Sequence, residues 1–292
     1  MNRKIVIMLA ALTVCIFALC GCGADSSSDA DSSESAAPVS SGDSTGDVAT
    51  GDSDSSAEAT INLYAAASLA DVLNAEIELY NQTNPGVDIV LTTGSSGDLM
   101  TQIEAADGVD IDIFFSAALK QMDQLTEEGY VDSANTVNLL KNEIVLIAAK
   151  GADTSVTGFS NITDASSIAL ADETVPVGSY AREAFDSLGI SVDDFAEVNT
   201  CSDVSAVKES VKEGSNEVGV VYYSDYYSVK DDVELVEICD QSLYSECIYP
   251  VSLVNNSAAT DAQKAAAEDF LEFLQTDEAK AIFEEYMFTI YE

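Results

Sequence analysis

Beyond residue 60, short apolar runs alternate with segments in which apolar residues recur at helical spacing. Residues 61–65 predict a strand, and residues 69–80 place most of their apolar side chains on one helical face. Strands that alternate with helices favour an α/β protein with βαβ units and parallel sheets, as one large sheet or as two lobes. The predicted strands are 61–65, 87–92, 109–116, 143–149, 168–171, 218–222, 233–239 and 249–254. The predicted helices are 69–80, 122–128, 181–188 and 261–275, with two more marked by Leu99, Met100 and Ile103 and by Val204, Val207 and Val211.

The first 22 residues follow a different pattern. Arg3 and Lys4 precede an apolar run at 5–19, which is short for a membrane span of about 20 residues and typical of a signal peptide. The run ends in Leu-Cys-Gly-Cys, which resembles a bacterial lipobox with its lipidated cysteine at Cys22. We therefore expect a lipoprotein signal peptide at 1–22 and an exported protein that is lipid-anchored to the outer face of the cell membrane. An ordinary cleaved signal peptide is the alternative.

Residues 23–58 are rich in serine, aspartate, alanine and glycine and contain no basic or aromatic residue. Such a segment buries too little apolar surface to offset its ordering entropy. The sequence predicts a disordered acidic tether between the anchor and the folded body. Calcium binding by this segment is not favoured, because the loop pattern of an EF-hand is absent.

Charge and composition exclude several function classes. The 292 residues include 52 acidic and 11 basic ones, for a formal net charge of −41, which disfavours nucleic acid as a partner. Any bound anion must therefore be held by short-range donors, since salt screens fields beyond about 8–10 Å. The chain has no histidine, which removes Ser-His-Asp and Cys-His catalysis and the commonest metal ligand.

Three cysteines lie in the body of the chain, at Cys201, Cys239 and Cys247. None belongs to a C-x-x-C motif, so neither a zinc site nor a thioredoxin-like site is supported. Cys239 and Cys247 could form a disulfide in an exported protein, or they could be buried or free thiols. Cys201 would be unpaired in either case.

Four segments predict a strand that ends in small residues and a helix that begins with hydroxyl or small side chains: 65–71, 93–99, 175–182 and 201–204. Ser68 is of the type expected for an N-cap, with Asp71 three residues later. The first turn of a helix has unpaired N–H groups and a partial positive charge. Several such turns aimed at one point form an anion site without lysine or arginine. Each segment alone is also compatible with ordinary capping.

Taken together, these segments carry a family resemblance. AAASL (65–69), GSS (94–96), DIFFSA (112–117), VPVGSYARE (175–183), GVVYYSD (219–225) and FTI (288–290) follow one another in this order. The series resembles the molybdate-binding proteins of bacterial ABC importers and spans residues 59–292.

This resemblance implies a two-lobed, periplasmic-binding-protein-like fold (type II) with the ligand in the interlobe cleft. Lobe 1 would comprise 59–142 and 250–292, and lobe 2 would comprise 143–249. The oxyanion would be bound by hydroxyl and backbone N–H groups of Ser68 and Ser96, the backbone N–H groups of Val177 and Val204, and the hydroxyl of Tyr222. Molybdenum or tungsten would be held only as the oxyanion through these residues, with no cofactor and no catalysis.

The donor set also bears on the ligand. A protonated phosphate brings its own donor, which would meet other donors and lose a hydrogen bond. This favours molybdate, tungstate or sulfate, and the resemblance favours the first two. We therefore expect a monomeric solute-binding protein that delivers molybdate or tungstate to the membrane permease of an ABC importer.

Three alternatives to this function are weaker. One is a binding protein for another oxyanion such as sulfate, and another is a surface adhesin. The third is a serine-based hydrolase, which would need a lysine base, and no S-x-x-K motif begins at Ser68 or Ser96.

Overall fold

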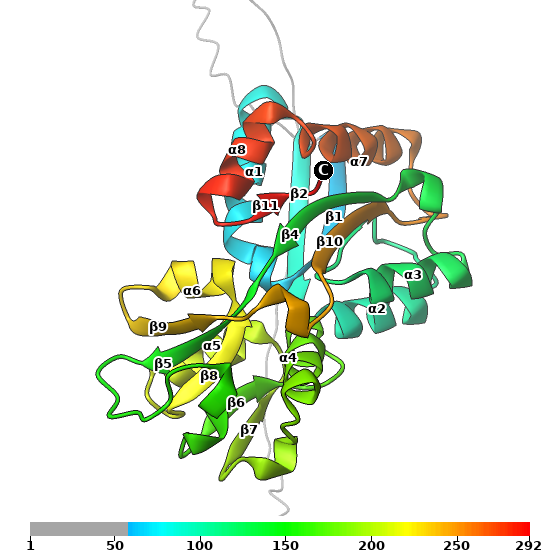
Figure 1. Ribbon diagram of the computed structural model, residues 1–292. Coiled ribbons are helices and arrows are strands. Elements are labelled where there is room, and N and C mark those ends of the chain that lie inside the picture. The colour runs from blue at the N-terminus through cyan, green and yellow to red at the C-terminus, as the bar shows by residue number, and fades with distance from the viewer. Residues whose placement is uncertain (1–57) are drawn as a thin grey trace, which may run out of the picture. The chain divides into compact units, whose positions relative to one another are not determined.

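Two mixed β-sheets organise residues 58–292, the part of the chain that the computed structural model describes (Figure 1). The first sheet has the strand order β11-β4-β10-β3-β1-β2, and the second has the order β7-β6-β8-β5-β9. The strands are β1 (Ala59–Ala66), β2 (Val87–Gly94), β3 (Ile113–Phe115), β4 (Val137–Asn142), β5 (Ile144–Ala149), β6 (Ile168–Ala171), β7 (Val198–Cys201), β8 (Val218–Tyr222), β9 (Val233–Ile238), β10 (Cys247–Leu253) and β11 (Thr289–Ile290). The predicted signal peptide, lipidation at Cys22 and nearly all of the predicted tether lie outside the described residues.

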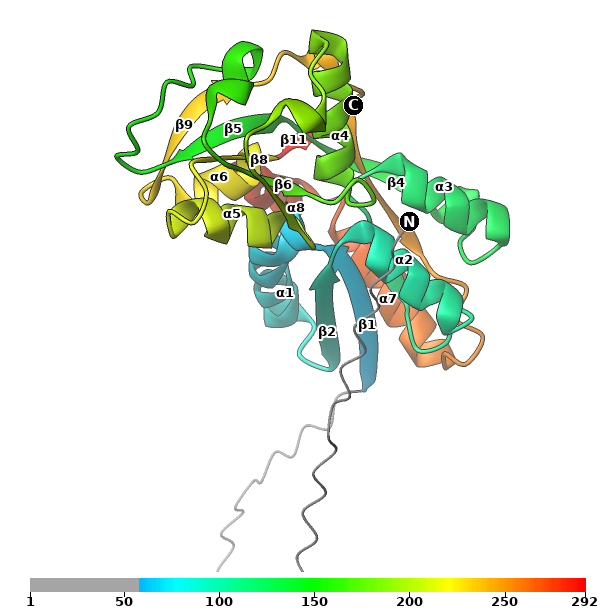
Figure 2. The same cartoon turned by 90° about the horizontal axis from the view of Figure 1, so that it is seen from below.

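Helices pack around each sheet, which confirms the predicted two-lobed α/β fold. We call the first sheet with its helices the first lobe, and the second sheet with its helices the second lobe. Figure 1 shows the two groups of elements one above the other, and Figure 2 shows the same structure from below, where parts of the two groups overlap. The first lobe contains α1 (Ala70–Thr83), α2 (Ser96–Ala105), α3 (Leu119–Glu128), α7 (Asp261–Phe273) and α8 (Asp277–Glu285), and the second contains α4 (Pro176–Leu188), α5 (Val204–Lys212) and α6 (Tyr223–Val229).

The predicted lobe limits stay a prediction, but the strands provide a frame for them. Strand β4 ends at Asn142 in the first sheet, and β5 begins at Ile144 in the second. The chain returns through β10, which begins at Cys247 and belongs to the first sheet. Figure 1 shows β4 leading directly into β5.

The expectation of parallel sheets is wrong for part of each sheet. Strands β1, β2 and β3 pair in parallel, as do β6, β7 and β8. Strand β10 runs antiparallel to β3 and β4, and β5 runs antiparallel to β8 and β9. One segment leaves the first lobe and another returns to it, so the strands at these crossings run in opposite directions.

The register of the parallel strands positions the helix starts. In the first lobe, Ala66 at the end of β1 is level with Gly94 at the end of β2. Phe115 at the end of β3 is level with Ala65. In the second lobe, Ala171 at the end of β6 is level with Cys201 at the end of β7. The segments that follow these strands therefore emerge together at the carboxyl edge of each sheet, where ligands bind in open α/β sheets.

Apolar side chains fill both lobes. Strand β5, with the sequence IVLIAA, is buried along nearly its whole length, as expected for a strand covered on both faces. No helix within residues 58–292 has the length and hydropathy needed to cross a membrane. Cys201, Cys239 and Cys247 are buried free thiols, so the disulfide left open by the sequence is not formed in this structure. Burial raises the pKa of the Cys239 thiol to about 12.

Candidate functional site

A small cavity lies where the helix starts of the two lobes meet. Its volume of about 10 Å³, counted for the centres of water-sized atoms, is room for about one water molecule. Its lining comprises Ala66, Ala67, Ser68, Gly94, Ser95, Ser96, Ala117, Val175, Pro176, Val177, Asp203, Val204 and Tyr222. The structure therefore brings together all five residues that the sequence analysis singled out: Ser68, Ser96, Val177, Val204 and Tyr222.

Ser68 lies in a short 3-10 turn, Ala67–Leu69, between β1 and α1. The expectation that it caps the helix is wrong, because the 3-10 turn displaces the start of α1 and makes Leu69 the N-cap, without a side-chain hydrogen bond. The Ser68 Oγ instead lies 3.1 Å from the Oη of Tyr249 in β10. The side chain thus faces the interlobe region rather than its own helix.

Ser96 is the first residue of α2, and the preceding Ser95 is the N-cap. The Ser95 Oγ accepts a hydrogen bond from the Asp98 N–H at 3.1 Å. The Ser96 Oγ accepts one from the Ala117 N–H at 3.0 Å. A backbone N–H can only donate, so the Ser96 hydroxyl retains its own proton for an acceptor elsewhere.

Val177 occupies the first turn of α4, which begins at Pro176. Proline has no N–H and suits this position, and the N–H of the next residue has no partner within the helix. A Cβ at Gly178 would collide with the carbonyl oxygens of Ala171 and Asp172, so glycine lets the helix start lie against the end of β6. The first turn of α4 is held in place by this close approach.

Arg182 in α4 does not line the cavity. Its Nη1 donates to the carbonyl oxygens of Ala171 and Gly178, at 2.8 and 2.7 Å. The guanidinium therefore stabilises the helix start, and the cavity contains no lysine or arginine among its lining residues.

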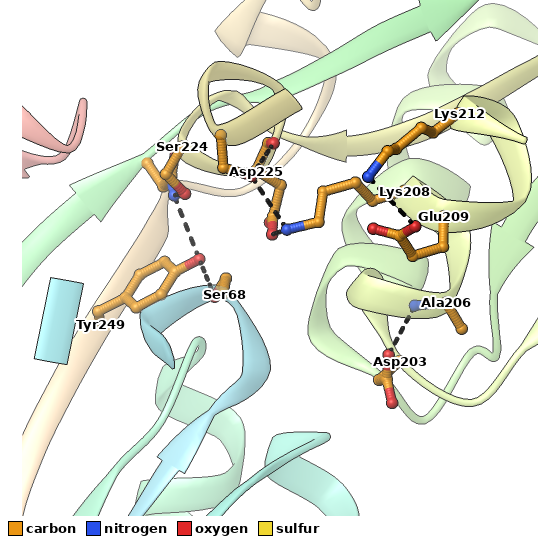
Figure 3. Close-up of polar contacts among 11 residues, drawn as sticks. Ser68, Asp203, Ala206, Lys208, Glu209, Lys212, Ser224, Asp225 and Tyr249 are labelled. Atoms are coloured by element: carbon orange, nitrogen blue, oxygen red, sulfur yellow. Dashed lines mark hydrogen bonds and ion pairs between the residues drawn. The ribbon is translucent and has the colours of Figure 1, made fainter. Parts of the chain in front are cut away.

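Val204 begins α5, and Asp203 is its N-cap. The Asp203 Oδ1 accepts from the Ala206 N–H (Figure 3), and the two atoms lie 2.9 Å apart. Asp203 is the one acidic residue in the cavity lining, and sequence reasoning did not assign it to the site. Its carboxylate is engaged in capping, which leaves the Val204 N–H as the donor contributed by this helix start.

Tyr222 is the last residue of β8 and the N-cap of α6. It is 2% exposed, and its Oη has no hydrogen-bond partner within residues 58–292. Burial raises its pKa well above the usual range for a tyrosine, so the hydroxyl keeps its proton at neutral pH. A buried hydroxyl without a partner costs about 1–3 kcal/mol, and an acceptor in the cavity would remove that cost.

The chemistry of this lining is that of a donor array. Neither serine hydroxyl is hydrogen-bonded to a lysine, aspartate or glutamate within the described chain, so no base is placed to activate a nucleophile. Residues 58–292 contain no cluster of three or more cysteine, aspartate or glutamate side chains that could hold a metal ion. The arrangement can bind a small acceptor.

Comparison with known proteins agrees with this geometry. The model of the bacterial extracellular solute-binding proteins matches residues 61–289. YvgL of Bacillus subtilis, provisionally named as an ABC transporter substrate-binding lipoprotein, is 34% identical over 237 residues, which cover 81% of this chain and 88% of YvgL. The molybdate-binding protein ModA of Escherichia coli is 31% identical over 240 residues, which cover 80% of this chain and 90% of ModA.

A solved structure from Clostridium difficile extends the similarity to the fold. It is described, again provisionally, as the substrate binding domain of a molybdenum ABC transporter, and it is 34% identical to this chain. The superposition covers 80% of this chain and 100% of that one, with a TM-score of 0.61. The chain belongs to the bacterial extracellular solute-binding proteins, which are non-enzymatic components of transport systems.

Proposed function

We propose that this protein captures molybdate or tungstate in the cavity between its lobes and delivers it to the membrane permease of an ABC importer. The observation that carries the proposal is the convergence of uncharged donors from both lobes on one small space. Ser68 and Ser96 contribute hydroxyls from the first lobe. Val177, Val204 and Tyr222 contribute two backbone N–H groups and a hydroxyl from the second.

Uncharged donors suit this chain. The net charge of −41 repels anions at long range, so binding must depend on contacts within a few ångströms. Helix first turns supply such contacts with a partial positive charge. A ligand that touches both lobes favours the closed arrangement through its contacts with each, and that arrangement is the form a permease would recognise.

The ligand class follows from what the donors lack. The proton of a hydrogen phosphate would need an acceptor, and the acceptors of the lining are already engaged: the Ser96 oxygen accepts from Ala117, and the Asp203 carboxylate accepts from Ala206 and Ser202. A fully ionised tetrahedral dianion needs only donors. Among such dianions, the names of ModA and of the Clostridium difficile protein support molybdate, and tungstate has the same charge and shape.

The proposal includes the cellular setting that the sequence predicts. The protein would be exported as a monomer and held at the outer face of the cell membrane through a lipid on Cys22, with no further cofactor. The name of YvgL, a lipoprotein, supports this part.

Calorimetric titration with molybdate, tungstate, sulfate and phosphate in turn tests the binding proposal. We expect one-site binding of molybdate and tungstate, and at 100 times Kd the bound anion should add about 2.7 kcal/mol to the free energy of unfolding. Ser68→Ala and Ser96→Ala should each weaken binding about tenfold. Parental affinity in both variants would contradict the assigned site, and failure of all four anions to bind would contradict the function.

A further inference from the structure

The Ser68 hydroxyl is in contact with a buried side chain that the sequence assigns only to a predicted strand, 249–254. Tyr249 belongs to β10, is fully buried, and points its hydroxyl at Ser68 (Figure 3). Asn142, at the end of β4, contacts the same tyrosine hydroxyl. These contacts join the two strands at the lobe crossings to the candidate site. The donor and the acceptor of each hydrogen bond follow from the chemistry of the groups involved.

The orientation of the Asn142 side-chain amide follows from its contact with the backbone. Its Oδ1 accepts a hydrogen bond from the backbone N–H of Glu143 at 2.9 Å. Because a backbone N–H can only donate, the amide oxygen must lie on that side, and the Nδ2 must lie on the other. Asn142 is 5% exposed, so its amide is held away from solvent.

The Tyr249 hydroxyl oxygen is a hydrogen-bond acceptor for Asn142. The Asn142 Nδ2 lies 3.3 Å from the Tyr249 Oη and 2.9 Å from the Ser224 Oγ. The amide nitrogen carries two hydrogens and no acceptor, so it donates to both oxygens. The Tyr249 oxygen therefore accepts from Asn142 and must place its own proton elsewhere.

The direction of the hydrogen bond between Tyr249 and Ser68 follows from the protonation of Tyr249. Burial raises the pKa of Tyr249 well above its usual range, so the phenol keeps its proton at any physiological pH. Besides Asn142, the Ser68 Oγ lies within hydrogen-bond distance of this hydroxyl, at 3.1 Å, and the protonated Tyr222 hydroxyl is a third neighbour. Tyr249 thus donates to Ser68, and the Ser68 proton is left to point away from Tyr249. Ser68 lines the cavity, so an acceptor there can receive that proton.

We propose that Tyr249, oriented by Asn142, is a positioning residue that fixes the Ser68 hydroxyl as a donor and thereby selects oxyanions without a proton. This inference rests on the proposed function. Ser68 then matches Ser96, whose oxygen accepts from the Ala117 N–H. With each serine oxygen already accepting from a protein donor, both hydroxyls are oriented to present their own protons to the cavity, which favours a bare dianion over a hydrogen phosphate.

The test is titration of four proteins with molybdate and with inorganic phosphate: the parent, Tyr249→Phe, Ser68→Ala and the double variant. Tyr249→Phe frees the Ser68 oxygen, so we expect molybdate affinity to fall about tenfold. Phosphate affinity should stay the same or rise, so the ratio of molybdate affinity to phosphate affinity should fall by a similar factor. In the Ser68→Ala background, Tyr249→Phe should have no further effect on either anion.

Ser224→Ala provides the matched control. It removes a hydroxyl that receives the other hydrogen of the same Asn142 amide and does not line the cavity. Its affinity for molybdate should stay within about twofold of the parent. Asn142→Leu removes the amide that donates to Tyr249 and so affects Ser68 only indirectly. It should change the molybdate and phosphate affinities in the same direction as Tyr249→Phe does, by a smaller factor. Thermal melting of each variant reports whether it is folded, and Asn142→Leu replaces Tyr249→Phe as the test if the latter does not fold.

The outcomes separate the two proposals. If the parent binds neither molybdate nor tungstate, the proposed function fails and this inference fails with it. If the parent binds and Tyr249→Phe has parental affinity and parental discrimination, the function stands and the positioning role is overturned. The same conclusion follows if Tyr249→Phe weakens molybdate binding equally with and without the Ser68 hydroxyl, because a purely structural role predicts that result.

Discussion

Gly97 in α2 of the first lobe lies against the backbone of Thr174 in the second. A Cβ at Gly97 would come within 3.0 Å of the Thr174 carbonyl oxygen, a separation that requires one of the two segments to shift. The absence of a side chain at this position therefore allows the lobes to approach as closely as they do beside the candidate site.

Gly97→Ala is expected to separate ligand affinity from fold stability. Alanine is favoured over glycine within a helix by about 1 kcal/mol, so the ligand-free protein should be as stable as the parent or more so. Closure should be hindered by the added methyl group, and oxyanion affinity should fall about three- to tenfold. Titration and thermal melting of the same samples check both halves, and parental affinity would show that this contact does not limit closure.

Tyr222→Phe should also change stability and affinity in opposite directions. The Tyr222 hydroxyl is buried without a partner, so its removal should leave the free protein unchanged or stabilise it by about 1 kcal/mol. If the hydroxyl donates to the bound oxyanion, affinity should fall about tenfold. Chemical denaturation without ligand gives the first quantity and calorimetry the second. A marked loss of stability with parental affinity would assign the hydroxyl a structural role instead.

Lys208→Met tests whether a nearby cation contributes to binding. Lys208 borders a groove of about 530 Å³ that also reaches Ser68, and its Nζ faces Asp225 (Figure 3). The Nζ lies 3.7 Å from Asp225 Oδ1 and 3.0 Å from Ser228 Oγ. Because the ammonium is engaged there, oxyanion affinity should change less than about twofold.

Stability should respond to Lys208→Met, and the response should depend on pH. Asp225 is 3% exposed, and burial raises its pKa to about 7 even with Lys208 present. Without the lysine, the ionised carboxylate is buried unpaired, which should cost about 1–3 kcal/mol at pH 8. The cost should shrink toward pH 5, where Asp225 is protonated. Urea denaturation at both pH values measures it, and an equal loss at each would contradict this pairing.

Glu76 in α1 predicts a separate pH dependence of folding. Its side chain is fully buried, both carboxylate oxygens lack a partner within the described chain, and burial raises the pKa to about 8. A carboxyl group with this raised pKa binds more protons in the folded state than in the unfolded state between pH 4.5, its ordinary pKa, and about 8. Its contribution to stability is therefore complete below the lower value and is lost as the pH rises to the upper one.

Glu76→Gln should remove this dependence, making the variant more stable than the parent by roughly 2–4 kcal/mol at pH 9 and similar to it at pH 4.5. Denaturation curves at the two pH values provide the measurement. Glu78→Gln is the matched control, since Glu78 is exposed on the same helix, and it should have little effect at either pH. Equal pH profiles for the parent and Glu76→Gln would show that Glu76 is not a buried neutral acid.

The pattern of apolar residues predicts well those strands that are buried along their whole length. Strands β6 and β8 lie where the sequence placed them, because each is a short run buried along its length and bounded by polar residues. Strand β4 was missed, since its sequence VNLLKN mixes polar and apolar residues without alternation. It crosses between lobes, where one strand meets several environments. The antiparallel direction of the crossing strands was also missed, because hydrophobic patterns do not encode direction.

The sequence predicts those parts of the candidate site whose residues are consecutive in the chain. It does not predict contacts between residues that meet only in the folded protein. Each helix start has small and hydroxyl side chains in consecutive positions, and the structure gathers all five named residues around one cavity. The 3-10 turn that withdraws Ser68 from capping left no signal in the residues. Asn142 and Tyr249 are 107 positions apart and meet only through the fold, so their link to Ser68 could not be read from the chain.

A crystal structure of the tungstate complex, with the metal located by its anomalous scattering, would show directly whether the five donors surround the bound oxyanion. We expect one metal peak in the cavity, with oxyanion oxygens about 3 Å from the hydroxyls of Ser68, Ser96 and Tyr222 and from the backbone N–H groups of Val177 and Val204. A peak outside this cavity, or an oxyanion held by a lysine or arginine side chain, would contradict this expectation.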